Sequence, residues 1–261
     1  MSAESEKLAE GTLISHLLEL RNRLIRALIA VGIVFLPCAY FANTIFEAVA
    51  QPLERFAKQY GIELIATQVT STFTTPFKLS FFVALFVAIP YVLYQIWAFV
   101  APGLYKHEKR FAVPLVTSSI VLFYIGVTFA YFFVFPVMFE FFAATAPKGV
   151  GIKIDIGNYL DFVLTMFLAF GVAFEVPIVV VLLVLTGIVS LEKLNGARGY
   201  VLIGIFVIAA ILTPPDAVSQ CIMAIPMYGL YEGGLIMARV LNGMKRKDDD
   251  ESGNDDKDPE K

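Results

Sequence analysis

The sequence predicts an all-α integral membrane protein with six transmembrane helices, and three observations lead to this fold class. Hydrophobic residues make up 58% of the chain and its mean hydropathy is +0.74, whereas an average soluble domain is about 45–50% apolar. Long uncharged runs occur along the chain, and several reach the ~20 residues that a helix needs to cross a ~30 Å hydrocarbon layer. Lysine and arginine are concentrated in alternate segments between these runs, as expected for a multispanning protein.

The first span is expected at about residues 24–42. A polar segment, Met1 to Arg26, precedes it, and the spacing of its apolar residues fits an amphipathic helix at the membrane surface. The small residues Ala48 and Ala50 also fit a signal-peptidase site, but the long apolar run and the long polar lead-in favour an uncleaved span. Asn43 to Lys58 has apolar residues on one face, so it is expected to form a short interfacial helix.

A charged loop separates the second and third spans, which are expected at about residues 76–98 and 114–138. Leu79 to Tyr105 and Phe111 to Phe139 contain no charged residue, whereas the loop between them has three cations: Lys106, Lys109 and Arg110. Because these cations lie close to the ends of both spans, they count fully toward the positive-inside bias. The loop is therefore predicted to be cytoplasmic.

The fourth span, at about residues 160–187, contains a carboxylate near its middle, Glu175. This position is about 20 Å or more from each end of the helix, where inserting an acid costs about 2.5–3.5 kcal/mol. A functional role is the default interpretation of such a residue. The alternative is a protonated glutamate bonded to a neighbouring hydroxyl or carbonyl, and Pro177 favours it by freeing the carbonyl of Ala173.

The last two spans, at about residues 198–212 and 217–236, differ from the others. Their uncharged stretches give only about 21–23 Å of helix each, so either the bilayer thins around them or another helix covers them. The sequence between them predicts a tight turn, because paired prolines cannot continue a helix: Pro214, Pro215 and Asp216. We expect a partner helix to dock on the outer face of this hairpin, where four residues are candidates: Ile205, Thr213, Gln220 and Met223.

The distribution of cations orients the chain in the membrane. Fifteen lysines and arginines lie in the termini and in the second and fourth loops, against four in the two longer outside loops. Both termini are therefore predicted to lie in the cytoplasm. Residues 1–240 are expected to form a single membrane domain. The charged segment 241–261 has no aromatic residue and is predicted to be a disordered cytoplasmic tail.

Catalytic chemistry has little support in the sequence. There is no nucleotide-binding glycine loop, and His and Cys are not spaced as metal ligands. We therefore expect no enzymatic activity, cofactor, metal or nucleic-acid partner. Cys38 and Cys221 lie in apolar runs, where unpaired thiols behave as small hydrophobic groups. Such a chain is expected to act as a binder, a channel or a transporter driven by a gradient.

Two surface acids, Glu19 and Glu108, lie in basic surroundings. Glu19 is spaced for an i,i+4 pair with Arg23, which contributes only a few tenths of a kcal/mol. Glu108 is flanked by the three cations of the charged loop, so it balances their charge. From the residues alone, both acids are interpreted as ordinary charge pairing.

Five motifs along the chain change this interpretation: His16-Leu-Leu-Glu-Leu-Arg21, Tyr94-Gln-Ile-Trp-Ala-Phe-Val-Ala-Pro-Gly-Leu-Tyr-Lys-His-Glu108, Phe123-Tyr-Ile-Gly-Val-Thr-Phe-Ala-Tyr131, Phe170-Gly-Val-Ala-Phe-Glu-Val-Pro177 and Leu212-Thr-Pro-Pro-Asp216. Together they resemble the TatC family, the multispanning subunits of the twin-arginine protein translocase. The resemblance extends from about Thr12 to Arg239.

The resemblance implies a site, a shape and partners. The site would bind the paired arginines of a folded cargo's signal peptide at the cytoplasmic surface, with five residues: Glu19, Arg21, Phe99, Leu104 and Glu108. The six helices would form a concave, glove-like arrangement in the inner membrane, with Glu175 facing the hollow. The implied partners are the single-span subunits TatA and TatB, further copies of the chain in a larger complex, and membrane lipid. Transport would be driven by the proton-motive force.

The alternative function is a proton- or ion-coupled transporter of small solutes that uses Glu175 as its relay. Folds of that kind usually carry matching short or interrupted helices in their two halves. In this chain the two short spans are adjacent instead, which disfavours this alternative. Deletion of the gene distinguishes the two functions, since it either retains folded cofactor-containing proteins in the cytoplasm or abolishes the uptake of one solute.

Overall fold

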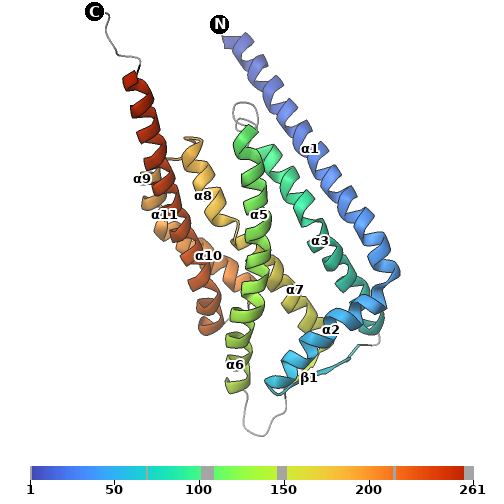
Figure 1. Cartoon of the computed structure of the whole chain (residues 1–261). Helices are drawn as coiled ribbons and strands as arrows, with labels where there is room; N and C mark the ends of the chain where they lie inside the picture. Colours follow the sequence, from blue (N-terminus) through green and yellow to red (C-terminus); the bar gives the residue numbers. More distant parts are fainter. Residues whose placement is uncertain (1, 69, 101–108, 146–151, 214–215, 256–261) are drawn as a thin grey trace, which may run out of the picture. The chain divides into compact units, whose positions relative to one another are not determined.

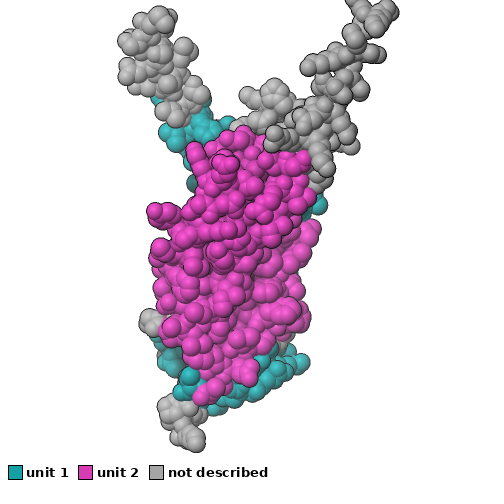
Figure 2. Space-filling view, turned by 90° about the vertical axis from the view of Figure 1, so that its left-hand side faces the viewer, with its two compact units in different colours: residues 1–120, 145–164 teal, residues 121–144, 165–261 magenta. Residues whose placement is uncertain are grey.

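The computed structural model describes residues 2–68, 70–100, 109–145, 152–213 and 216–255, most of which are helical (Figure 1). The chain forms two compact units, each built from two separate stretches of sequence. Unit 1 consists of residues 1–120 and 145–164, and unit 2 of residues 121–144 and 165–261 (Figure 2).

Unit 1 contains two long helices, one shorter helix and two strands, together with the first parts of two further helices. These elements are α1 (Ser2–Tyr40), α2 (Ala42–Gln59), β1 (Ile62–Ile65), α3 (Ser71–Val100), the start of α5 (Lys109–Phe129), β2 (Ile152–Asp155) and the start of α7 (Ile156–Ala173). The polar N-terminal segment and the first span form one continuous helix, α1, with Pro37 near its end.

Helices α1 and α3 pack along a narrow stripe of small and aromatic side chains. Ala27 and Val31 of α1 are buried, and the ring of Phe35 meets that of Phe81 edge-on, with centroids 5.8 Å apart. Most other large apolar residues of α1 are exposed, including Leu28. An apolar helix with so little covered surface is expected where lipid, rather than water, surrounds it.

A two-stranded parallel sheet is a correction to the all-α prediction. β1 pairs with β2 in the register Ile62↔Ile152, and no sequence pattern indicated that these two four-residue segments pair. The side chain of Asp155, the last residue of β2, accepts hydrogen bonds from the Thr67 backbone N–H at 2.8 Å and from its hydroxyl at 2.6 Å. The same carboxylate accepts the N–H of Gly157 at 2.9 Å, so it also caps the first turn of α7.

These bonds lower the pKa of Asp155 below its usual 3.8, mainly through the hydroxyl of Thr67. A carboxyl with a lowered pKa contributes stability above its ordinary pKa, and it loses that contribution as the pH falls through the lowered value. The hydrogen bonds between Asp155 and Thr67 are therefore fully formed at neutral pH.

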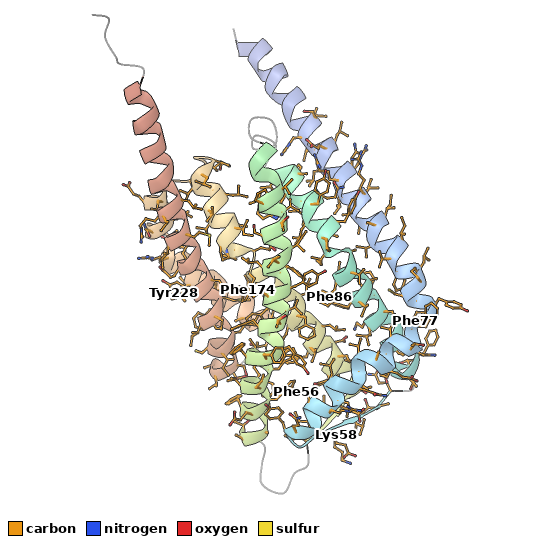
Figure 3. All side chains as sticks on the ribbon, viewed as in Figure 1. Phe56, Lys58, Phe77, Phe86, Phe174 and Tyr228 are labelled. Carbon is orange, nitrogen blue, oxygen red and sulfur yellow. The ribbon has the colours of Figure 1, made fainter. Side chains whose placement is uncertain are left out.

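A helix is present where one was predicted, at Asn43 to Lys58, and it is α2. It buries Leu53 and Ala57 against its own unit, and the hydroxyl of Tyr159 donates to the backbone oxygen of Leu53 at 2.9 Å. Gly61 follows with φ +72°, a conformation that glycine adopts without strain. The polar face of α2 includes Lys58, which pairs with Glu54 at 2.7 Å (Figure 3).

Unit 2 contains the remaining helices. These are the end of α5, a π-helical turn η1 (Ala130–Val134), α6 (Phe135–Thr145), the end of α7, α8 (Val176–Leu185), α9 (Leu191–Gly196), α10 (Arg198–Leu212) and α11 (Ala217–Asp255). Its core lies between α8 and α11, where six buried side chains pack together: Val180, Val181, Val184, Tyr231, Leu235 and Ala238. A Cβ on Gly234 would lie 2.8 Å from Cα of Pro177, so glycine allows the two helices to approach closely.

The span predictions are confirmed in part. Among the described residues, five helices are long and apolar enough to cross a membrane: 14–40, 71–100, 113–145, 156–185 and 217–243. The fifth predicted span is present as the shorter apolar helix α10. The structure therefore has the predicted apolar segments, but one of them is shorter than the usual length of a span.

Helix α11 differs from the prediction in length. It continues through Glu232 and on to Asp255, so the last span is not short and residues 241–255 are helical rather than disordered. Arg198 forms two bonds of 2.8 Å with Glu232, which neutralises the carboxylate within the helix. Residues 241–255 contain no proline, so no backbone constraint ends the helix there.

Candidate functional site

The polar end of α1 and the C-terminal end of α3 form a cluster in unit 1. His16, Glu19 and Arg23 recur at intervals of three and four residues on α1, which places them on one face of the helix. Gln95 and Phe99 are spaced by four residues on α3 and share a face in the same way. Side chains from the two helices are in contact at this point.

Arg23 is at the centre of this cluster. Its Nε and Nη2 donate to Oε1 of Glu19 at 2.9 and 2.7 Å, and its Nη1 lies 3.5 Å from Oε1 of Gln95. The side chain of Glu19 is 41% exposed, that of Arg23 is 23% exposed, and Gln95 is only 4% exposed. The cluster therefore presents an accessible carboxylate supported by a buried amide.

Aromatic contacts hold the same helix ends together. The rings of His16 and Phe99 stack with centroids 4.4 Å apart and an angle of 20° between their planes. One turn before the end of α3, Trp97 donates to the hydroxyl of Ser119 at 2.7 Å, and both residues are buried. These contacts fix the position of the C-terminal end of α3.

The structure places three of the five predicted signal-binding residues. Glu19 and Phe99 belong to the cluster, whereas Arg21 is exposed and its Nη2 donates to Asn22 at 3.3 Å. Leu104 and Glu108 lie outside the described residues. The sequence analysis did not identify Gln95 as a site residue, although Gln95 lies within the second motif. A neutral polar residue in an apolar run gives no indication of which side chain it contacts.

Glu175 lies at an interruption between two helices rather than within one helix. The predicted fourth span is divided into α7 and α8, with Glu175 as the residue before α8 and Pro177 in the first turn of α8. The residue is buried, at 8% exposure, and Phe174 beside it packs on Phe129 with centroids 5.5 Å apart (Figure 3). The proline ends the hydrogen-bond ladder of α7 because it has no N–H.

The predicted docking residues are mostly packed inside unit 2. Met223 is fully buried, Ile205 is 9% exposed and Thr213 is 6% exposed, and the Thr213 hydroxyl already donates to the Ala209 oxygen at 2.8 Å. Gln220 is half-buried. The exposed face of α10 is formed by neighbouring residues instead: Tyr200, Ile203, Val207 and Ile211.

Of the three residues predicted to form the turn between α10 and α11, the structure describes Asp216. Asp216 accepts the N–H of Ser219 through its Oδ1 at 2.7 Å, and it therefore caps the N-terminus of α11. Pro214 and Pro215 lie outside the described residues.

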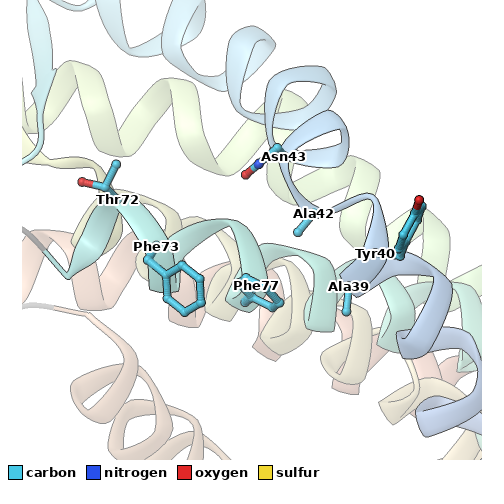
Figure 4. A pocket seen from close by; sticks show the side chains of 7 residues that line it. All are labelled: Ala39, Tyr40, Ala42, Asn43, Thr72, Phe73 and Phe77. Carbon is cyan, nitrogen blue, oxygen red and sulfur yellow. The ribbon is translucent and has the colours of Figure 1, made fainter.

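A surface pocket of about 580 Å³ lies at the other end of α1 and α3. Seven residues line it: Ala39, Tyr40, Ala42, Asn43, Thr72, Phe73 and Phe77 (Figure 4). None of these seven side chains is charged, so the pocket offers no carboxylate to pair with a basic ligand. The α1–α3 cluster around Glu19 is the better candidate for binding a cation.

Comparison with known proteins gives the family. The family described as Sec-independent protein translocase protein (TatC) matches residues 15–226, which is well over half of the chain. The chain belongs to the TatC family. The TatC protein of Escherichia coli K12 is 53% identical over 234 residues, covering 90% of each chain, and that of Azotobacter chroococcum is 51% identical, covering 92% of this chain and 94% of the relative.

A solved TatC structure confirms the relationship at the level of the fold. The crystal structure of a twin-arginine translocase receptor, TatC, superimposes with a TM-score of 0.77 at 38% identity, covering 86% of this chain and 98% of that one. Membership of the TatC family identifies a multi-pass membrane subunit of the Sec-independent protein translocase. It also identifies a transport component rather than an enzyme.

Proposed function

We propose that this TatC protein recognises the twin-arginine signal peptide of folded cargo at the cytoplasmic side of the inner membrane and initiates export driven by the proton-motive force. In this proposal both termini are cytoplasmic. The six helices form a concave, glove-like arrangement, and Glu175 faces its hollow. The observation that carries the proposal is the accessible carboxylate of Glu19, which already binds a guanidinium in the α1–α3 cluster.

Two adjacent arginines present two planar forks, and each fork can form a bidentate, charge-assisted pair with a carboxylate. Lysine is a compact point charge and does not reproduce this geometry. We assign Glu19 and Glu108 as the two acids, with Arg21, Phe99 and Leu104 near them. The surrounding cations repel a dibasic ligand in general, so recognition depends on the positions of the two carboxylates rather than on a broad acidic surface.

Site-directed cross-linking tests the location of the site. A photoreactive residue at position 19 or 108 is expected to cross-link to a twin-arginine signal peptide, and an excess of unlabelled peptide is expected to suppress the product. A photoreactive residue at the exposed position Tyr40, at the opposite end of α1, serves as the control and is expected to give no peptide product. Equal products at positions 19 and 40 would contradict the proposed site.

We propose that the single-span subunits TatA or TatB dock on the α10–α11 hairpin. The support is the length of α10, 15 residues, since a helix of about 22 Å leaves a mismatch that a neighbouring helix relieves. Because Ile205, Thr213 and Met223 are largely buried within the unit, the contacts are assigned to the exposed face with Ile203 and Val207. Thr213 and Gln220 then support this face.

Disulfide cross-linking checks this docking face. Cysteines at Ile203 or Val207 are expected to form disulfides with a cysteine in the span of TatA or TatB. A cysteine at the intervening Ile205, whose side chain faces its own unit, is expected to give none. If position 205 cross-links as well as its exposed neighbours, the face is assigned wrongly.

We propose that Glu175 offers a hydrogen bond to a polar group that passes or docks during transport. Glu175 is buried at a helix interruption, and glutamine has a side chain of the same length that can donate a hydrogen bond. Glu175→Gln is therefore expected to retain export, whereas Glu175→Ala is expected to lose it at an equal protein level. Full export by the Ala variant would make the residue structural only, and loss in both variants would indicate titration instead.

A further inference from the structure

The pocket at the junction of α1, α2 and α3 lies where the surface of unit 1 changes from polar to apolar. On one side, the exposed face of α2 carries charged and amide side chains, among them Glu47, Gln51 and Arg55. On the other side, the exposed residues of α1 and α3 are large and apolar, since Leu36 is 71% exposed and Phe81 is 45% exposed. A ligand that matches both surfaces has a polar end and an apolar end.

An ion pair next to the pocket indicates its depth in the membrane. Lys78 follows the pocket residue Phe77, and its Nζ lies 2.6 Å from the carboxylate of Asp161; the two side chains are 52% and 40% exposed. Because charged side chains are costly to insert at the centre of a bilayer, an exposed ion pair belongs near the membrane surface. The pocket therefore lies at the level of the lipid headgroups and glycerol, and the apolar surface of α1 and α3 continues from it into the hydrocarbon.

The lining of the pocket suits the ester region of a phospholipid. The rings of Phe73 and Phe77 pack together with centroids 4.9 Å apart and offer an apolar wall to an acyl chain. Asn43 of α2 and Thr72 of α3 bring an amide and a hydroxyl to the same pocket (Figure 4), and both groups can donate hydrogen bonds to ester or phosphate oxygens. The volume of about 580 Å³ is typical of pockets that hold small ligands.

We propose that this pocket binds one phospholipid of the bilayer through its glycerol esters and the upper part of its acyl chains. None of the lining side chains is charged, so the pocket does not select a headgroup by its charge, and zwitterionic and anionic phospholipids bind equally well. The bound lipid contacts the end of α1 and the first turns of α2 and α3 at once, and it thereby stabilises their junction. This lipid site is independent of the proposed signal-peptide site, which lies at the opposite end of α1.

Native mass spectrometry tests whether the pocket holds a lipid. The full chain is released from nanodiscs that contain equal amounts of phosphatidylethanolamine and phosphatidylglycerol, and the phospholipids that stay bound are counted. Phe73→Ala removes part of the apolar wall and is expected to weaken the binding of one phospholipid about fivefold or more. Phe132→Ala is the matched control and is expected to keep this lipid, because Phe132 is similarly exposed, 63% against 69%, but belongs to unit 2.

Lipids bound elsewhere are retained by both variants, so the difference between Phe73→Ala and the parent identifies the lipid of the pocket. This lipid is expected to carry the two headgroups in equal shares. The inference fails if Phe73→Ala loses no lipid, or if Phe132→Ala loses as much. A parent whose pocket lipid is phosphatidylglycerol alone also contradicts it, since an uncharged pocket provides no cation for that selection.

A charge placed in the pocket tests the position of the headgroup. Asn43→Lys is expected to shift the pocket lipid toward phosphatidylglycerol by about two- to fivefold, the range that corresponds to one exposed ion pair. Gln51→Lys makes the same charge change at an exposed position of α2, about two turns further on, and is expected to keep the ratio of the parent. If the two variants shift the ratio equally, or if neither shifts it, the headgroup does not lie at this pocket and the inference is overturned.

Discussion

Replacing Glu19 by lysine is expected to block export of twin-arginine cargo without lowering the amount of protein in the membrane. Loss of one acid from a partly desolvated charge pair costs roughly 2–5 kcal/mol, which is about 30-fold or more in peptide affinity. The reversed charge adds repulsion of the signal arginines and of Arg23. Folding is expected to be preserved because the side chain of Glu19 is 41% exposed. Peptide binding, export of a folded reporter and the level of inserted protein are the measurements.

Glu54→Lys provides the matched control for this charge reversal. Glu54 also belongs to unit 1, forms an i,i+4 ion pair with Lys58 and is 40% exposed, but it lies on α2, outside the α1–α3 cluster. This variant is expected to export normally. The double variant Glu19→Ala, Glu108→Ala tests whether the two acids bind the signal peptide at all. If it binds a twin-arginine peptide as tightly as the parent does, and with the same preference over a twin-lysine peptide, neither acid binds the signal peptide.

Gly126→Ala is expected to destabilise unit 2, and Gly126→Leu is expected to prevent its folding. A Cβ at this position lies 2.5 Å from the backbone oxygen of Phe170 and 3.0 Å from the ring of Phe174. A backbone atom cannot rotate away, so α5 and α7 have to separate. Overpacking of this kind costs about 1–3 kcal/mol for a single methyl group, which corresponds to a fall in Tm of roughly 2–12 °C. Thermal unfolding of the purified protein is the measurement.

Gly204→Ala makes the same substitution where there is room. A Cβ on Gly204 meets nothing within 4 Å, and alanine favours a helix over glycine by about 0.5–1 kcal/mol. The Tm of this variant is expected to stay constant or to rise. If Gly126→Ala unfolds at the temperature of the parent, the close approach of the two helices is absent from the protein in solution.

The positions of the spans were predictable because the length of an apolar run is a local property. The break at Glu175 was partly predictable, since Pro177 must free a backbone carbonyl, but a proline alone does not decide between a bend and an end. The length of α11 was not predictable. Glu232 looks like the end of an apolar run, and the sequence does not indicate its pairing with Arg198, 34 residues earlier.

The candidate site was predictable to a smaller extent. Glu19 and Arg23 are spaced for a pair, and that pair is present. The contact with Gln95 spans 72 residues, and the stacking of His16 on Phe99 joins two different helices. Such contacts depend on how the helices pack against each other, and the spacing of residues along the sequence does not predict that packing. The role of the acids came from the resemblance of whole motifs, not from the charges themselves.

The pairing of β1 with β2 also sets an order of events during synthesis. Thr67 and Asp155 are 88 residues apart, and at about 5–20 residues per second the ribosome needs roughly 4–18 s to produce the second after the first. During that interval β1 has no strand partner, and all of the chain from 121 to 144, which belongs to unit 2, is made before unit 1 is complete. Unit 1 therefore cannot be completed until residues 145–164 have been made, and a nascent chain stopped before β2 exposes the unpaired edge of β1.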